Sequence, residues 1–174
     1  AGIALCPEDR KEQGLVLQRS IKDNVSIPVL EKVRRMLFLD RRAESDLADT
    51  AVTKYGIKTP TTDKKVAELS GGNQQKVILG RWTNERMVTK VLILDEPTKG
   101  IDVGTKAEIY QMVCDFAQQG IGVIFISSEL TEVINIADKV YVMRGGRIAG
   151  SLHRTEATEE RVLALAMHEG DQAS

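Results

Sequence analysis

Two stretches between Leu69 and Gly104 contain residues that could do phosphate chemistry. In the first, Ser70, Gly71 and Gly72 open a segment with helical spacing. Ser70 could cap this helix. The two glycines lack a Cβ, so backbone N–H groups could approach an anion at the positive end of the helix dipole. The stretch predicts a helix start suited to phosphate, and a simple helix cap is the alternative.

The second stretch is an apolar run that ends in two carboxylates. Residues 91–94 are Val-Leu-Ile-Leu, and Asp95 and Glu96 follow directly. Such a run is typical of a buried parallel strand, and open α/β sheets bind ligands at the edge where their strands end. Asp95 could hold Mg²⁺, directly or through water, while Glu96 could orient or deprotonate an attacking water. Nucleotide hydrolysis needs this division of labour.

Taken in order, the motifs resemble those of the ABC-type ATPases. Residues 69–72 (Leu-Ser-Gly-Gly) resemble the signature motif, residues 92–97 (Leu-Ile-Leu-Asp-Glu-Pro) the Walker B motif, and residues 100–102 (Gly-Ile-Asp) the D-loop. The resemblance covers nearly the whole chain. It implies an α/β, P-loop NTPase-like fold with a parallel-sheet core and a helical subdomain, and it implies ATP and Mg²⁺ as cofactors.

The resemblance also implies roles for single residues. Asp95 would support the metal and Glu96 would act as the general base. At the switch loop, where a histidine usually contacts the γ-phosphate, this sequence has Ser128. A hydroxyl is shorter and uncharged, so hydrolysis at the Glu96 site could be slow or supported differently.

Six further positions are expected to contact nucleotide. Glu8 stands where the Q-loop has a glutamine, and Asp102 ends the D-loop and could also cap the next helix. The signature residues would serve the ATP held by a second nucleotide-binding domain; they are Ser70, Gly71, Gly72 and Asn73, the last standing where many members have glutamine.

Residues 7–11, Pro-Glu-Asp-Arg-Lys, point to a subfamily. With Gln-Gly-Leu at 13–15 they resemble the second ATPase half of bacterial importers for ribose, xylose, arabinose and galactose. The implied function is an ATP-hydrolysing subunit that powers sugar uptake from the cytoplasmic face of the cell membrane. Its partners would be a second nucleotide-binding domain, a transmembrane sugar permease and, indirectly, a periplasmic sugar-binding protein. Alternatively, residues 8–11 are only a solvated charged turn.

Other patterns predict the elements that position these residues. Strands are expected at 2–6 and 122–126, the latter buried, and a hairpin at 139–152 around Gly145-Gly146. Helices are expected to begin after caps at Asp40, Asp102 and Thr158. The second would bury Ile109, Met112, Val113, Phe116 and Ala117; the third would bury Val162, Leu163, Ala166 and Met167.

The domain organisation follows from the resemblance. A helical and signature subdomain would occupy about 20–85, the sheet core 1–19 and 86–152, and a C-terminal helix 153–174. The exposed side of residues 20–68 would face the permease.

Composition argues against several classes. The net charge is −1, from 24 basic and 25 acidic residues, so no bulk attraction for nucleic acid exists. No run of about 18 apolar residues is present, so membrane association must come through a partner. Cys6 and Cys114 lack metal or redox spacing and are expected to be buried thiols, while His153 and His168 are expected at the surface.

One motif of the family is absent. None of the 14 glycines is followed by lysine, so there is no Gly-x-x-x-x-Gly-Lys-Ser/Thr loop. We expect the C-terminal part of a second nucleotide-binding domain, without its phosphate-loop half and inactive alone.

Two other functions compete with this one. A non-catalytic nucleotide-sensing module is suggested by Ser128 and the missing loop, although Glu96 would then be unnecessary. A chromosome-maintenance or DNA-repair ATPase is disfavoured by the short link from Ser70 to Asp95 and by the neutral charge.

Overall fold

The computed structural model describes residues 2–35 and 38–167, which form two compact units divided between Ile124 and Phe125. The first unit contains, in chain order, β1 (Ile3–Cys6), η1 (Arg10–Gly14), α1 (Ile21–Ser26), η2 (Ile27–Val33), β2 (Arg34–Arg35), β3 (Phe38–Leu39), α2 (Arg41–Tyr55), η3 (Val66–Glu68), α3 (Gly71–Trp82), β4 (Val91–Asp95), α4 (Val103–Gln118) and the start of β5 (Gly122–Ile126).

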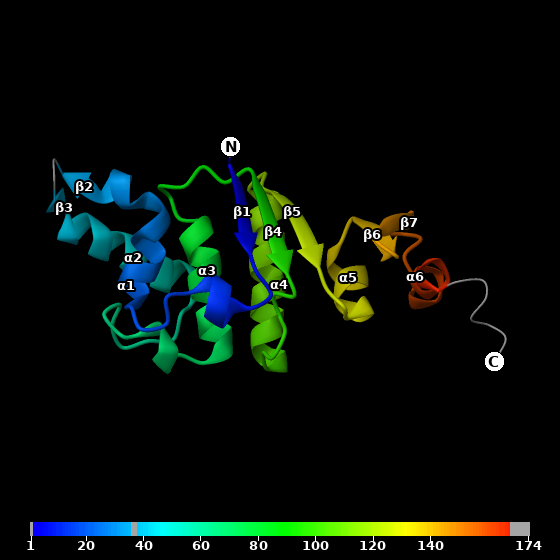
Figure 1. Cartoon of the computed structure of the whole chain (residues 1–174), viewed down its shortest axis with the longest axis horizontal. Coiled ribbons are helices and arrows are strands. Elements are labelled where there is room, and N and C mark those ends of the chain that lie inside the picture. Colours follow the sequence, from blue (N-terminus) through cyan, green and yellow to red (C-terminus); the bar gives the residue numbers. More distant parts are fainter. Residues whose placement is uncertain (1, 36–37, 168–174) are drawn as a thin grey trace. The chain divides into compact units, whose positions relative to one another are not determined.

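A sheet with the strand order β1-β4-β5 confirms the α/β prediction (Figure 1). β1 and β4 are parallel, with Ala4 beside Leu92 and Cys6 beside Leu94. These four side chains share one face and are at most 4% exposed. On the opposite face, Ile3 and Leu5 are 64% and 50% exposed. The sheet is therefore covered on one side only within the described residues.

The prediction that residues 122–126 form a strand is confirmed, but the prediction that the strand is buried is wrong. Its residues alternate between exposed and half-buried, and Ile124 is 50% exposed. β5 is an outer strand of the described sheet, so it lacks the neighbours that bury β4.

Helices α1, α2 and α3 pack together beside the sheet (Figure 1). As predicted, Asp40 caps α2 by accepting hydrogen bonds from two backbone N–H groups. The helix ends at Gly56, which has a φ of +58°. Leu47, Ala51 and Tyr55 form the buried side of this helix. The apolar repeat at four-residue spacing thus marks a core-facing stripe.

A buried arginine joins α3 to η1 and α1. The Arg81 guanidinium donates to Gly14 O, Asn24 O and Asn24 Oδ1, at 2.5, 2.8 and 2.7 Å. Asn24 in turn donates to Val16 O and Ser20 O. Burial lowers the pKa of Arg81. The same burial raises the pKa of the Cys6 thiol to about 12.

The prediction for α4 is confirmed except at one position. Asp102 caps the helix, and Ile109, Met112, Val113 and Phe116 are buried. Ala117 is exposed, because each residue turns 100° around the helix and position 117 leaves the stripe. The Phe116 ring packs edge-on against the Tyr55 ring with the ring centroids 6.1 Å apart, and this contact links α4 to α2.

The second unit contains the end of β5, α5 (Leu130–Ile136), β6 (Lys139–Arg144), β7 (Arg147–His153) and α6 (Glu159–Ala166). The predicted hairpin is confirmed, with Gly145 and Gly146 at φ +55° and +75°. The inward face predicted for α6 is partly wrong: Val162 is buried and Leu165 packs beside it, but Leu163, Ala166 and Met167 are exposed. A helix of two turns that docks by one edge buries only the residues on that edge.

The remaining predictions concern single residues. Cys6 is buried and His153 exposed, as expected, whereas Cys114 is only half-buried. His168 lies outside the described residues. Among the described helices, none has the length and apolar character needed to cross a membrane.

Gly72 lies so close to α4 that a Cβ there would collide with Thr105 Cγ2. We expect Gly72→Ala to lower the free energy of unfolding by about 1–3 kcal/mol, the usual cost of overpacking. Thr105→Ser removes that methyl and keeps the hydroxyl, so the double variant should lose less than the sum of the two single variants. Urea unfolding of all four proteins measures this coupling. If the losses of the two single variants simply add, the collision is relieved by a movement that does not involve the Thr105 methyl.

An ion pair also joins α3 to α4, because Lys76 Nζ lies 2.5 Å from Glu108 Oε2. The hydrogen bond from Lys76 lowers the pKa of Glu108. A carboxyl with a lowered folded-state pKa stabilises the fold above its unfolded pKa, and this is lost as the pH falls through the folded value. We expect Glu108→Gln to cost about 1 kcal/mol or less near neutral pH, since Glu108 is half exposed and screened by solvent.

The difference in unfolding free energy between wild type and Glu108→Gln should shrink as the pH falls below 4.5, the ordinary pKa of glutamate. Urea unfolding across that range measures it. In a Lys76→Met background the same substitution should show no such trend, and a difference that stays constant on acidification would contradict the assignment.

Candidate functional site

The turns that follow β1 and β4 meet at one edge of the sheet. Parallel pairing places Cys6 beside Leu94, so both chains leave the sheet at its carboxyl edge. Glu8 Oε1 then lies 2.5 Å from Lys99 Nζ, and Arg10 Nη1 donates to Lys99 O at 2.8 Å. The ion pair with Glu8 raises the pKa of Lys99. The Q-loop position and the turn after Walker B are thus in direct contact.

The two predicted catalytic carboxylates lie at the start of this second turn. Asp95 is the last residue of β4 and is half-buried. Glu96 has a φ of +44° and is the one described non-glycine residue with a positive φ. This left-handed backbone costs energy for a residue with a Cβ, and strained residues of this kind cluster at active sites and ligand clamps. Hydrogen bonds from Lys99 N to Glu96 O and from Ile101 N to Thr98 O close the turn.

The start of α3 has the predicted cap. Ser70 Oγ accepts from Asn73 N at 3.4 Å and from Asn73 Nδ2 at 2.9 Å. Asn73 Oδ1 accepts from Lys58 N, so both the oxygen and the nitrogen of the Asn73 side-chain amide are hydrogen-bonded. The N–H groups of the first turn have no partner within the helix and can serve an anion. Both the cap and the phosphate interpretation fit this geometry.

The two signature glycines also have a packing role. A Cβ on Gly71 would lie 2.7 Å from Arg10 Nη2, and one on Gly72 would strike Thr105. The clash at position 72 is with the branched Thr105 side chain, whereas at position 71 it is with the flexible tip of Arg10. Glycine at both positions permits the close approach of these neighbouring segments, whatever binds there.

Asp102 caps α4 with both carboxylate oxygens. Oδ1 accepts from Thr105 N at 3.0 Å and Oδ2 from Thr105 Oγ1 at 2.8 Å. The backbone hydrogen bond from Thr105 lowers the pKa of Asp102. Its cap is confirmed; contact with nucleotide stays a prediction.

Ser128 belongs to the second unit and is exposed. Its neighbour Ser127 donates from Oγ to Glu132 Oε2 at 2.9 Å and accepts from Glu129 N at 3.0 Å. These bonds organise the turn into α5 within that unit. They do not test the catalytic role expected of Ser128, which stays a prediction.

The donor set at the site fits Mg²⁺ held largely by phosphates and water. No group of three or more His, Cys, Asp or Glu side chains that could cage a metal occurs in the described ranges. Mg²⁺ is commonly bound by one or two carboxylates plus substrate phosphates, and Asp95 could supply one of these.

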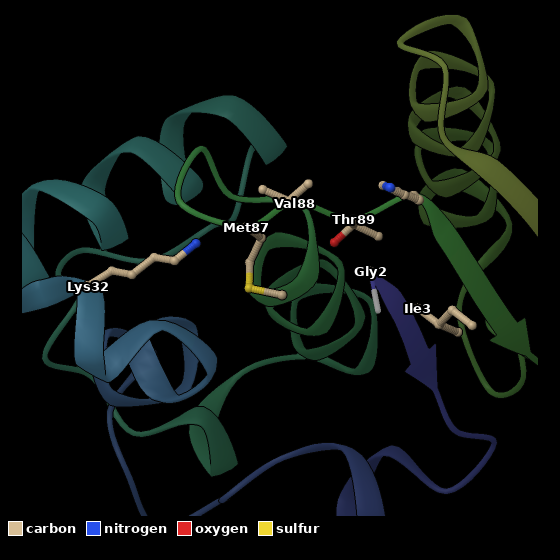
Figure 2. Close-up of a pocket in the computed structure, with 7 residues that line it drawn as sticks. Gly2, Ile3, Lys32, Met87, Val88 and Thr89 are labelled. Atoms are coloured by element: carbon tan, nitrogen blue, oxygen red, sulfur yellow. The ribbon is translucent and has the colours of Figure 1, made fainter.

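A pocket of about 440 Å³ lies elsewhere in the first unit (Figure 2). Its lining includes Gly2 and Ile3 at the start of β1 and Lys90 just before β4. It is therefore at the amino-terminal edge of the sheet, opposite the edge that carries Asp95. The remaining lining residues are Lys32, Met87, Val88 and Thr89.

Sequence patterns did not indicate three residues of the site, namely Arg10, Lys99 and Thr105. Arg10 stands in the Pro-Glu-Asp-Arg-Lys run, which was the one available signal. The contacts of Lys99 with Glu8 and Arg10, and the approach of Thr105 to Gly72, join residues far apart in the sequence, and no local pattern encodes such contacts.

Comparison with known proteins identifies the family of this chain. The family described as "ABC transporter" matches residues 2–99. The chain is 51% identical over 173 residues to the "Arabinose import ATP-binding protein AraG" of Burkholderia pseudomallei (strain 1710b), covering 99% of this chain and 34% of that protein. It is 48% identical over 167 residues to the protein of the same name from Pectobacterium atrosepticum, covering 95% and 32%. It thus spans about a third of the length of these curated relatives.

Solved structures agree on the fold. The cbiO1 protein of Clostridium perfringens, described as part of an ABC transporter complex, matches with a TM-score of 0.72 and 26% identity, over 93% of this chain and 61% of that one. A dimeric ATP-binding cassette in a post-hydrolysis state bound to ADP and Pi matches with a TM-score of 0.73 and 18% identity, over 87% and 62%. The sequence motifs, the parallel sheet and these matches agree, and the chain belongs to the ABC transporter family, to whose ATP-binding domain its sequence and fold correspond.

Proposed function

We propose that this chain is part of the ATP-hydrolysing subunit of a bacterial sugar importer, with arabinose as the sugar. The observation that carries the hydrolytic role is Glu96, held with a left-handed backbone directly after Asp95 at the carboxyl edge of the sheet. Relatives about half identical over nearly the whole chain are named arabinose import proteins, which supports the choice of sugar.

In this proposal each residue has one task. Asp95 holds Mg²⁺, which would neutralise charge on the ATP phosphates. Glu96 orients the attacking water and takes its proton. The first-turn N–H groups of α3, with Ser70, donate to a γ-phosphate bound by a second domain. Ser128, at the switch-loop position, would contact the γ-phosphate of the ATP that Glu96 hydrolyses.

The phosphate loop would come from residues of the same protein outside this chain. The curated relatives are about three times as long, which leaves room for that loop and for a further ATP-binding domain. The exposed apolar side chains of Ile3 and Leu5 also fit a sheet that is covered by additional chain in the whole protein. The chain alone would then be inactive.

The surface facing the permease would lie on the helical part of the first unit. Among the described residues from 27 to 39, four apolar side chains are at least 39% exposed; they are Ile27, Leu30, Phe38 and Leu39. Exposed apolar groups clustered in one segment are typical of a protein contact. The subunit would sit on the cytoplasmic face of the membrane, with a periplasmic sugar-binding protein acting indirectly through the permease.

Glu96→Gln tests the hydrolytic role in the intact protein assembled with its permease. It keeps the size of the side chain and removes the base, so ATP hydrolysis should fall by about 10²–10³-fold while ATP binding persists. Phosphate release and nucleotide binding measure the two effects. The exposed Glu85→Gln is the matched control and should change neither. Hydrolysis within threefold of wild type in Glu96→Gln would instead favour a non-catalytic nucleotide-sensing module.

Ser128→His tests the departure at the switch loop. An imidazole reaches further than a hydroxyl and can carry charge, so hydrolysis by the intact protein should rise or stay equal. Steady-state phosphate release measures the rate. A fall of tenfold or more would mean that the serine has a specific role of its own.

A further inference from the structure

Three segments far apart in the sequence meet around the side chain of Arg10. They are the turn after β1, the start of α3 and the turn after β4. Arg10 Nη1 donates to Lys99 O at 2.8 Å, and this bond joins residues 89 positions apart. Arg10 Nη2 lies over the bare Cα of Gly71 and near Gly100, where added Cβ atoms would come within 2.7 and 3.8 Å of it. One planar guanidinium therefore touches all three segments.

We propose that Arg10 is a positioning residue that fixes the start of α3 relative to the turn that begins at Glu96. This deepens the proposed ATPase function and rests on it. Ser70 to Gly72 would serve one ATP, while Glu8 and the Glu96 turn would serve another. A contact that links these groups couples the state of one site to the placement of the residues that close the other.

The side-chain chemistry favours this role over plain stabilisation. Arg10 Nε is buried and lacks a hydrogen-bond partner in the described part of the chain. A buried donor without a partner is unfavourable, so the site keeps the guanidinium at some cost to stability. Arginine also suits the geometry, because its rigid fork can donate through Nη1 while Nη2 lies close to Gly71. A lysine ammonium is a single point and cannot do both.

An ion pair lies beside this hydrogen bond and should hold the two turns together less strongly. The Glu8–Lys99 ion pair joins side chains that are 49% and 64% exposed. Exposed pairs contribute little because solvent and salt screen them. Lys99 offers two separable partners here: its side chain pairs with Glu8 and its backbone carbonyl accepts from Arg10. A Lys99→Met variant therefore breaks the ion pair and leaves the Arg10 hydrogen bond in place.

Hydrogen exchange in the intact protein tests the proposal without relying on activity. Two reporter segments are protected by known hydrogen bonds: Gln74 N to Ser70 O in α3, and Lys99 N and Ile101 N in the turn after β4. Arg10→Ala should raise exchange in both reporters by about tenfold or more, since a charged donor is lost between them. Lys99→Met should raise it by less than about threefold, and the exposed neighbour Lys11→Ala should not change it.

The outcomes distinguish a failure of the positioning role of Arg10 from a failure of the proposed ATPase function. Increased exchange confined to residues 8–14 in Arg10→Ala would overturn the positioning role, as would an equal effect of Lys99→Met. With the role intact, Arg10→Ala should also lower kcat for ATP hydrolysis more than it raises KM, and Arg10→Lys should not rescue it. If the wild-type protein hydrolyses no ATP, the proposed function fails, while the exchange result still decides whether Arg10 links the segments.

Discussion

The parallel pairing of β1 with β4 is the constraint on which the rest of the first unit depends. In a parallel pair, both strands leave the sheet at the same edge, so the residues that follow Cys6 and Asp95 must share one region of space. The contacts between the two turns follow from this placement: Glu8 reaches Lys99 and Arg10 reaches the Lys99 carbonyl. The strained backbone at Glu96 lies at the start of the second turn. An antiparallel arrangement of the same strands would put the two turns at opposite edges.

The position of α3 requires a second, polar support. Among the described residues, the Arg81 guanidinium donates to the backbone carbonyls of Gly14 and Asn24 and to the Asn24 side-chain amide. A charged group is costly to bury and costly to leave unpaired. These three acceptors therefore offset part of the cost of burying the guanidinium. α3 is fixed at its far end by this network and at its start by the close approaches at Gly71 and Gly72.

The sequence predicted the structural features that depend only on interactions between neighbouring residues. The caps at Asp40, Ser70 and Asp102, the apolar strand that ends at Asp95 and the glycine hairpin at residues 145–146 depend on a few adjacent residues, and the structure has them all. The exposure of Ile124, the outward side of α6 and the contact of Arg10 with Lys99 depend on which segments lie alongside. No window of the sequence contains that information. The carboxylates of the site were accordingly predictable, and the residue that links them to α3 was not.

The separation in sequence between β1 and β4 also affects how the chain reaches its fold. The helices from α1 to α3 contact one another locally, whereas β1 must wait for a partner that is made almost ninety residues later, the span that Arg10 and Lys99 also bridge. Contacts of such long range are slow to form because the loop must first be closed. During synthesis, the apolar strand of Ile3 and Leu5 is made before β4 and cannot pair with it until β4 follows. We expect the helical part to assemble first and to bring the two strands together, so that this apolar strand waits less long for β4.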